Sequence, residues 1–125
     1  MARSDDLDKL LGPLEAKVMR AVWAADESGP VTPRQVLERI NGGRSQPLAY
    51  TTVMTVMSRL ADKELLRRTK VGRGWAYEAL AKDAAEIAVR DVMRDFGEAA
   101  LAHFVAESRS DPKLRRRLER LLREE

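Results

Sequence analysis

The first apolar pattern along the chain repeats at helical spacing. It covers residues 13–25, where Pro13 suits the first position of a helix and the run DESGP ends it. The inward stripe of this helix consists of Leu14, Val18, Ala21 and Val22. The preceding residues 1–9 are polar and acidic with no apolar run behind them, so we expect a flexible tail rather than a signal peptide.

A second helix is expected to begin at Thr32. This residue can cap the helix, Pro33 suits the first position, and Gln35 can reach back to the cap in a capping box. Its apolar side consists of Val36, Leu37 and Ile40. The run at residues 41–43, Asn-Gly-Gly, should stop the helix, because both residue types adopt the left-handed terminal conformation readily.

A third helix, from about Ala49, has two different faces. At about 100° per residue, its apolar positions fall on one side and its hydroxyl-bearing positions fall on the other. The apolar side consists of Val53, Val56, Met57, Leu60 and Ala61. The polar side consists of Thr51, Thr52, Thr55, Ser58, Arg59 and Asp62, with Met54 at the edge between the two sides. β-Branched threonine is a mediocre helix former, and three of the five positions from Thr51 to Thr55 are threonine. This density of threonine indicates that these side chains have a function.

The pattern changes from helix to β-hairpin after Lys63. LLRRTK has the composition of a strand, VGRG is a turn with two glycines, and WAYEAL alternates large apolar with small or polar residues. The hairpin places four cations beside the third helix, namely Arg67, Arg68, Lys70 and Arg73. Three helices followed by a hairpin indicate a winged helix-turn-helix domain, which we assign to residues 10–81.

Three more helices are expected over residues 82–125, the second domain. The first runs to about Phe96, Gly97 permits a break, and the second covers residues 98–107. The last begins at Ser110-Asp111-Pro112 and carries a narrow seam of Leu114, Leu118, Leu121 and Leu122. Such a seam on a terminal helix is typical of helix packing between chains, although packing on its own domain is the alternative. The fold class is mainly α with one small β-hairpin.

Charge and composition narrow the possible partners. The net charge is +3, and residues 44–73 alone hold seven basic and two acidic side chains, which favours a polyanion as partner, although a solvated charged face is the alternative. The chain has no cysteine and one histidine, His103, so disulfides, thiolate metal sites and histidine metal clusters are not expected. No apolar run approaches the length of a membrane span, and we expect a cytoplasmic protein without a cofactor.

The polar side of the third helix predicts a surface that enters the major groove of duplex DNA. Threonine offers a hydroxyl to phosphates or base edges and a methyl to thymine, and Arg59 can read guanine or clamp a phosphate. We therefore predict DNA contacts from Thr51, Thr52, Met54, Thr55, Ser58, Arg59, Arg67, Arg68, Lys70 and Arg73. The hairpin cations are expected to contact phosphates rather than bases.

These residues resemble a known family. LGPLEAKVMRAVW, TPRQVLERI, AYTTVMTVMSRL and LLRRTKVGRGWAYEAL are similar to segments of the penicillinase-repressor family of winged-helix repressors, the BlaI and MecI type, with copper-responsive CopY repressors as relatives. The resemblance is strong over about residues 10–80 and looser beyond. It implies Thr51, Thr52, Thr55 and Arg59 as groove-facing positions and Arg73 at the wing tip. Met54 stands where some relatives have a basic residue.

The resemblance also implies a homodimer on two-fold symmetric operator DNA, joined through the C-terminal helices. The expected dimer contacts are Ile87, Val92, Phe96, Leu101, Phe104, Leu114, Leu118, Leu121 and Leu122. Many relatives are derepressed when a membrane sensor leads to cleavage before a Phe-Val pair, which matches His103-Phe104-Val105 here. Ordinary core packing of Phe104 and Val105 is the alternative. Copper sensing through C-terminal cysteines is excluded.

The sequence therefore predicts a DNA-binding transcriptional repressor. Two other classes stay open: a small-molecule-responsive winged-helix regulator, and a winged-helix module that binds only proteins. An enzyme is the least expected class, because a single histidine, no cysteine and no Ser-His-acid grouping leave little to carry catalysis.

Overall fold

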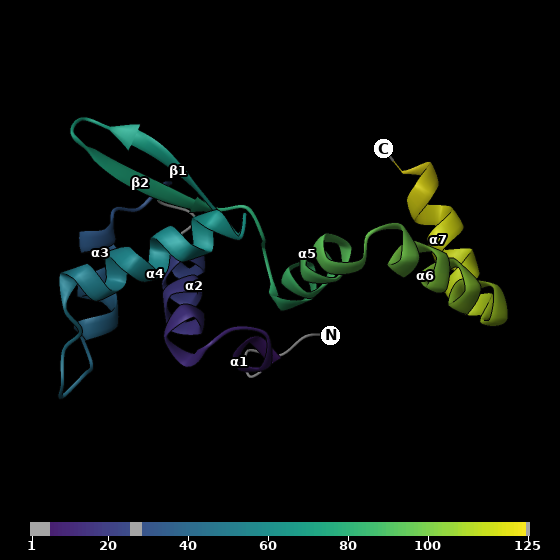
Figure 1. Ribbon diagram of the computed structural model, residues 1–125, viewed down its shortest axis with the longest axis horizontal. Coiled ribbons are helices and arrows are strands. Elements are labelled where there is room, and N and C mark those ends of the chain that lie inside the picture. Colours follow the sequence, from purple (N-terminus) through teal and green to yellow (C-terminus); the bar gives the residue numbers. More distant parts are fainter. Residues whose placement is uncertain (1–5, 26–28, 125) are drawn as a thin grey trace. The chain divides into compact units, whose positions relative to one another are not determined.

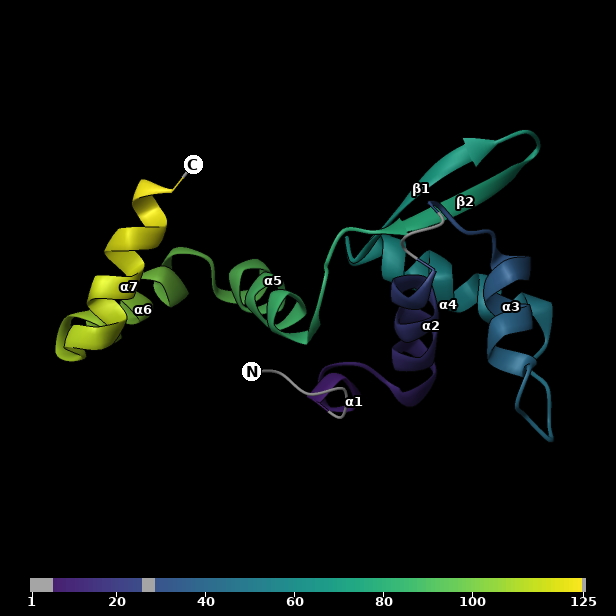
Figure 2. The same cartoon turned by 180° about the vertical axis from the view of Figure 1, so that it is seen from behind.

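The computed structural model describes residues 6–25 and 29–124 (Figures 1 and 2). Its elements are α1 (Leu7–Leu10), α2 (Pro13–Ala24), α3 (Pro33–Asn41), α4 (Tyr50–Asp62), β1 (Leu66–Val71), β2 (Gly74–Ala79), α5 (Ala84–Phe96), α6 (Glu98–Ser110) and α7 (Pro112–Arg123). The helices and the single antiparallel hairpin confirm the predicted fold class. The chain divides into two compact units between Ile87 and Ala88, here called unit 1 and unit 2.

The N-terminal segment of unit 1 differs from the expected flexible tail. Leu7 begins the short helix α1 and is 1% exposed, and Leu11 just after α1 is also buried in the core. Apolar side chains at 7, 10 and 11 thus hold this segment against the core, a pattern too short to stand out as a helical repeat. Residues 1–5, also within the expected tail, lie outside the described part of the chain.

The helices α2, α3 and α4 enclose the core of unit 1. The capping box at the start of α3 is confirmed: the Gln35 backbone N–H donates to Thr32 Oγ1 at 3.2 Å, and the Thr32 N–H donates to Gln35 Oε1 at 2.9 Å. The helix α3 stops at Asn41 as expected, but the left-handed conformation expected there is wrong, because Gly42 has φ −58° and neither Asn41 nor Gly43 has a positive φ. Instead, the Asn41 side chain closes the next loop by bonding the backbone N–H and C=O of Leu48 at 2.8 and 3.1 Å.

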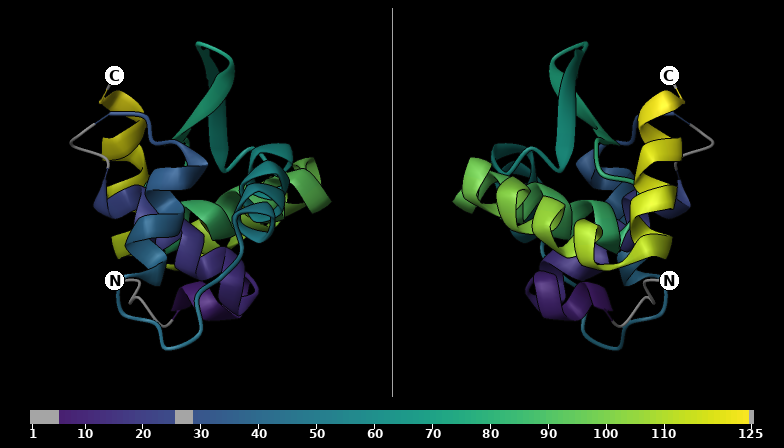
Figure 3. Two further views of the ribbon diagram at one scale, coloured as in Figure 1. Left: turned by 90° about the vertical axis from the view of Figure 1, so that its left-hand side faces the viewer. Right: turned by 90° about the vertical axis from the view of Figure 1, so that its right-hand side faces the viewer.

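The hairpin lies where the sequence predicted it and projects from the helices of unit 1 (Figure 3). Its register pairs Leu66 with Ala79 and Val71 with Gly74, and Gly72 takes the positive φ of the turn, +60°. Val31 adds a single bridge to Tyr77, with N–H···O distances of 2.8 and 2.7 Å. The buried Leu66 and the bridge to Val31 anchor the base of the hairpin, while its tip stays exposed.

The end of unit 1 lies beyond residue 81, where we expected the first domain to end. The Trp23 indole N–H donates to the Ala81 carbonyl at 2.8 Å, and Ala84 and Ile87 at the start of α5 belong to the same core. Ile87 is 0% exposed. The expectation that Ile87 contacts a partner chain is therefore wrong: the side chain is enclosed by its own unit, which leaves no surface for a partner.

Unit 2 consists of most of α5 together with α6 and α7. Gly97 separates α5 from α6 and has φ +55°, a conformation that favours glycine. Asp111 caps α7 by accepting the backbone N–H of Lys113 and Leu114 at 3.0 and 3.2 Å. In α7 the seam positions Leu114 and Leu118 are half-buried, so part of the predicted leucine seam packs within unit 2. No helix in the described ranges has the length and apolar character needed to cross a lipid bilayer.

Candidate nucleic-acid interface

One side of α4 is buried and the other is open, as its spacing predicted. Val53, Val56, Met57 and Leu60 are at most 3% exposed and join the core of unit 1. The opposite side carries Thr51, Thr52, Thr55, Ser58 and Arg59, which we call the recognition face. Thr51, Thr55 and Arg59 are exposed, while Thr52 and Ser58 are half-buried. The packing of α4 on α2 and α3 thus fixes which side chains can reach a partner.

The threonines of the recognition face do not offer identical chemistry. The Thr55 hydroxyl donates its hydrogen to the Thr51 carbonyl at 2.9 Å, one turn earlier. Thr55 therefore presents a methyl group and an oxygen that can only accept. Such a surface suits a thymine methyl or an amino group of adenine or cytosine better than a phosphate, which needs a donor.

Two of the four predicted hairpin cations are engaged within unit 1. The Arg67 guanidinium pairs with Glu78 across the hairpin, and Arg68 pairs with Asp62 of α4 at 3.5 Å. Asp62 is an acid on the same side as the recognition face, where it would repel phosphates. Arg68 neutralises the charge of Asp62 and joins the base of the hairpin to α4. Its main effect is therefore to position the hairpin against α4 and to reduce the negative charge beside the recognition face.

The other two hairpin cations are better placed for an external anion. Lys70 Nζ lies 5.8 Å from the centre of the Trp75 ring, and the Arg68 guanidinium lies at the same distance. The indole therefore makes a cation–π contact with each of these cations. Arg73 stands in the turn itself, is exposed, and has no ion-pair partner among the described residues. The tip of the hairpin therefore presents Arg73 to solvent, in agreement with the wing-tip position expected for it.

A groove lies between α4 and the hairpin, and the start of α3 contributes to it. This wing groove has a volume of about 610 Å³. It is lined by Thr32, Pro33, Arg34, Tyr50, Met54, Val71, Arg73, Gly74, Trp75 and Tyr77. Arg34, Tyr50 and Trp75 were not among the predicted site residues. In the sequence, the only sign of these three residues is that aromatic and basic residues alternate. Their proximity depends on the tertiary fold.

Comparisons with known proteins identify the family of this chain. The profile of the family described as penicillinase repressor matches residues 11–124. The chain belongs to the penicillinase repressor family. It is 38% identical over 102 residues to the transcriptional regulator BlaI of Mycobacterium tuberculosis, in both strain CDC 1551 / Oshkosh and strain ATCC 25618 / H37Rv. Each match covers 76% of this chain and 71% of the relative. The chain is thus a transcriptional regulator with DNA as its partner, and not an enzyme.

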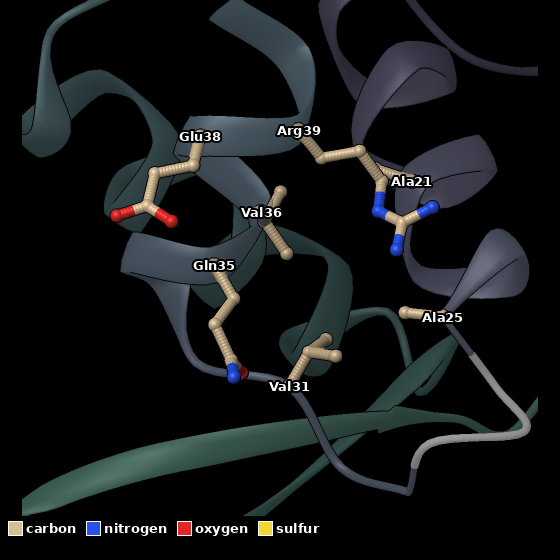
Figure 4. A pocket seen from close by; sticks show the side chains of 7 residues that line it. All are labelled: Ala21, Ala25, Val31, Gln35, Val36, Glu38 and Arg39. Atoms are coloured by element: carbon tan, nitrogen blue, oxygen red, sulfur yellow. The ribbon is translucent and has the colours of Figure 1, made fainter. Parts of the chain in front are cut away.

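A second hollow in this penicillinase repressor family member has a different character. It lies between α2 and α3, has a volume of about 470 Å³, and is lined by both an acid and a base, Glu38 and Arg39 (Figure 4). Arg39 extends from α3 toward Ala21 of α2, whereas Glu38 leaves the helix in another direction (Figure 4). The mixed charge and small aliphatic walls give it no evident preference for an anion, so we do not assign it to the DNA interface.

In unit 2, the family member exposes an apolar surface. Among the described residues, eight large apolar side chains of unit 2 are exposed: Val89, Val92, Met93, Phe96, Leu101, Phe104, Leu121 and Leu122. A hollow of about 390 Å³ is lined only by apolar residues of α5 and α6, namely Ala88, Val89, Val92, Met93, Ala100, Leu101 and Phe104. Six of these eight exposed residues were expected as dimer contacts, whereas Val89 and Met93 were not, nor were Ala88 and Ala100 of the adjoining hollow.

The candidate cleavage position lies in the middle of α6. His103 is exposed and Phe104 is 46% exposed, so Phe104 is not enclosed by its own chain. Both residues are helical, with α6 continuing to Ser110. Proteases bind substrates in an extended conformation, so cleavage here requires local unfolding of α6.

Proposed function

We propose that the chain represses transcription by binding two-fold symmetric operator DNA as a homodimer. The single observation that supports this most strongly is the placement of the recognition face. Threonines and Arg59 project from α4 beside a cationic hairpin, and a buried apolar side holds α4 in place. In this proposal α4 enters the major groove, Arg59 reads a base edge, and the hairpin contacts the adjoining backbone.

The affinity that repression needs argues for two copies. A single small module binds DNA non-specifically with a dissociation constant of about 10⁻⁴ to 10⁻⁶ M. Tethering two modules makes the second docking event intramolecular and can raise the affinity about 10²- to 10⁴-fold. The exposed apolar surface of unit 2 supports a self-association role, since monomeric proteins rarely leave so many large apolar side chains in water.

We propose further that proteolysis inactivates the repressor. Cleavage between His103 and Phe104 would cut α6, which carries Leu101 and Phe104 of the apolar surface. The recognition face would stay intact, but the gain from tethering would be lost. A membrane sensor protease, acting directly or through another protease, would supply the cut. The need to unfold α6 first predicts slow cleavage of the intact dimer.

A small-molecule effector is the alternative signal. The hollow in unit 2 would be its site, but its lining is apolar throughout and provides no convergent polar groups to orient a metabolite. A second copy of the chain suits such a surface better than a polar effector does.

Selection of bound duplexes tests the proposal directly. Purified protein is incubated with random duplex fragments at moderate salt, and the bound fraction is sequenced. We expect two-fold symmetric half-sites whose centres are separated by about one helical turn of DNA or a multiple of it. No enrichment of any sequence over competitor would overturn the DNA-binding proposal, and enrichment of single, unpaired half-sites would overturn the dimer.

A further inference from the structure

The wing groove collects the exposed apolar side chains of unit 1. Among the described residues of this unit, four large apolar side chains are exposed: Tyr50, Met54, Val71 and Trp75, at 37, 39, 59 and 43%. All four line the wing groove. Exposed apolar residues scattered singly need no explanation, but their gathering in one groove indicates a contact surface.

The charged residues of the wing groove are both basic. Arg34 enters from the first turn of α3, and Arg73 enters from the hairpin turn. No Asp or Glu lines the groove among the described residues. A ligand that suits this lining has regularly placed anionic groups with less polar groups between them. A sugar–phosphate strand has this chemistry, because its phosphates alternate with sugars.

The position of the wing groove also fits one strand of a duplex. On the surface of duplex DNA, the major and minor grooves are separated by a single sugar–phosphate strand. On this chain, the wing groove lies between α4, which carries the recognition face, and the hairpin. At about 100° per residue, Met54 and Tyr50 lie about 60° and 100° from Thr51 on the same flank of α4, so this flank forms one wall of the groove.

We propose that the wing groove holds one sugar–phosphate strand of the bound DNA, contacted by Arg34 and Arg73 from opposite walls, with Tyr50 positioning Arg34. This inference rests on the proposed function and extends it to a set of contacts outside the recognition face. Arg34 and Arg73 add affinity that is independent of base sequence, while the recognition face supplies the sequence preference.

Arg34 is already oriented before DNA arrives. Its guanidinium lies 5.1 Å from the centre of the Tyr50 ring, within the range of a cation–π contact. The capping box of Thr32 and Gln35 fixes the backbone of the turn from which Arg34 extends. A guanidinium held on a ring keeps its planar set of donors available to phosphate oxygens and loses less freedom on binding.

Salt-dependent binding of single variants tests the phosphate contacts. Arg34→Ala and Arg73→Ala are compared with Arg39→Ala, a matched control that removes the same charge from α3 about 140° around the helix from Arg34. Dissociation constants for the selected duplex are measured between 50 and 200 mM salt. Because a bound dimer loses one phosphate contact in each chain, each groove variant should lower the slope of log affinity against log salt by about 1.8. Its affinity deficit relative to the wild type should then shrink about 12-fold over this range. Arg39→Ala should keep the wild-type slope.

The same variants distinguish a phosphate contact from a base reader. Arg34→Ala should weaken binding to the selected duplex and to a scrambled duplex by the same factor. A slope for Arg34→Ala equal to that of Arg39→Ala, with sequence-specific wild-type binding intact, would overturn the groove inference alone. Absence of any wild-type binding to DNA would instead overturn the proposed function, and this inference with it.

Two substitutions of Tyr50 test the positioning step. Tyr50→Phe keeps the ring under Arg34, and its affinity should match that of the wild type. Tyr50→Leu removes the ring and should weaken binding, but it should have no further effect when combined with Arg34→Ala. Equal losses from both Tyr50 variants, or fully additive losses with Arg34→Ala, would overturn the positioning role. Thermal unfolding by circular dichroism verifies that each variant is folded.

Discussion

Replacing Phe96 with alanine should separate the proposed dimer without disturbing the fold of either unit. Phe96 is 66% exposed in the single chain and lies near the end of α5. Alanine is the best helix former, so the substitution keeps the helix while removing the ring. The structure therefore predicts a variant whose fold is intact and whose self-association is weak.

The expected loss of dimer stability follows from the area of the Phe96 ring. A phenylalanine side chain can bury roughly 200 Å², of which 66% is still open to solvent in the single chain. At about 25 cal/mol per Å², covering this area stabilises the dimer by about 3 kcal/mol per chain. Alanine retains part of that area, so we expect a loss of roughly 2 kcal/mol per chain and 4 kcal/mol per dimer, about a thousandfold in the dimer dissociation constant.

Sedimentation equilibrium over a range of concentrations measures this constant for the wild type, Phe96→Ala and Phe96→Leu. The leucine variant keeps most of the apolar area and serves as the matched control, so it should stay dimeric. Operator binding by Phe96→Ala at nanomolar protein should weaken about 10²-fold or more, because the tethering gain is lost. A wild-type dissociation constant for Phe96→Ala would refute the assignment of the exposed apolar surface of unit 2 to self-association.

Three further outcomes are expected. Arg59→Ala should cost about 1–3 kcal/mol per half-site on the selected duplex and much less on a scrambled one, measured by fluorescence anisotropy. Equal losses on both duplexes would show that Arg59 contacts a phosphate rather than a base. Arg68→Ala should weaken DNA binding by roughly 1 kcal/mol, because it leaves the charge of Asp62 unneutralised. Adding Asp62→Asn to this variant should restore the wild-type affinity. An affinity that stays low in the double variant would show that Arg68 itself contacts DNA. Thr32→Ala removes the acceptor for the Gln35 N–H and should lower stability by about 1 kcal/mol, or about 4–8 °C in Tm by circular dichroism; an unchanged Tm would contradict a stabilising cap.

Local sequence signals predicted most of the fold. The helical stripes, the capping residues and the two-glycine turn each act within a few residues, so α2, α3, α4 and the hairpin lie within one to three residues of their expected bounds. The C-terminal helices also begin where their caps predicted. The helix α6 ends at Ser110 rather than at about residue 107, because no helix-breaking residue follows Gly97 before Pro112.

What the sequence could not supply are effects of tertiary packing. The helix α1 is held by contacts of Leu7 with the core rather than by its own propensity. Ile87 has the spacing of a dimer contact, but only the fold shows that it is enclosed by unit 1. The ion pair of Arg67 with Glu78 joins the two strands, and that of Arg68 with Asp62 joins β1 to α4, so charge counting alone overstated the free cations of the hairpin.

The same limit applies to the wing groove. Arg34, Tyr50 and Trp75 come from three different elements, and nothing in their separate sequence neighbourhoods indicates that they meet. The recognition face, by contrast, is a property of one helix and could be predicted from its period alone.

Because the chain contains no cysteine, a single introduced cysteine permits a direct test of whether the recognition face of α4 lies in the major groove. A single Met54→Cys variant carries a DNA-cleaving metal chelate at the edge of this face, and Lys17→Cys on α2 carries the same chelate as control. On the selected duplex, Met54→Cys should cleave at two places, one in each half-site, with centres about one helical turn apart or a multiple of it, and Lys17→Cys should cleave weakly or not at all. Strong cleavage from Lys17→Cys with none from Met54→Cys would contradict the account.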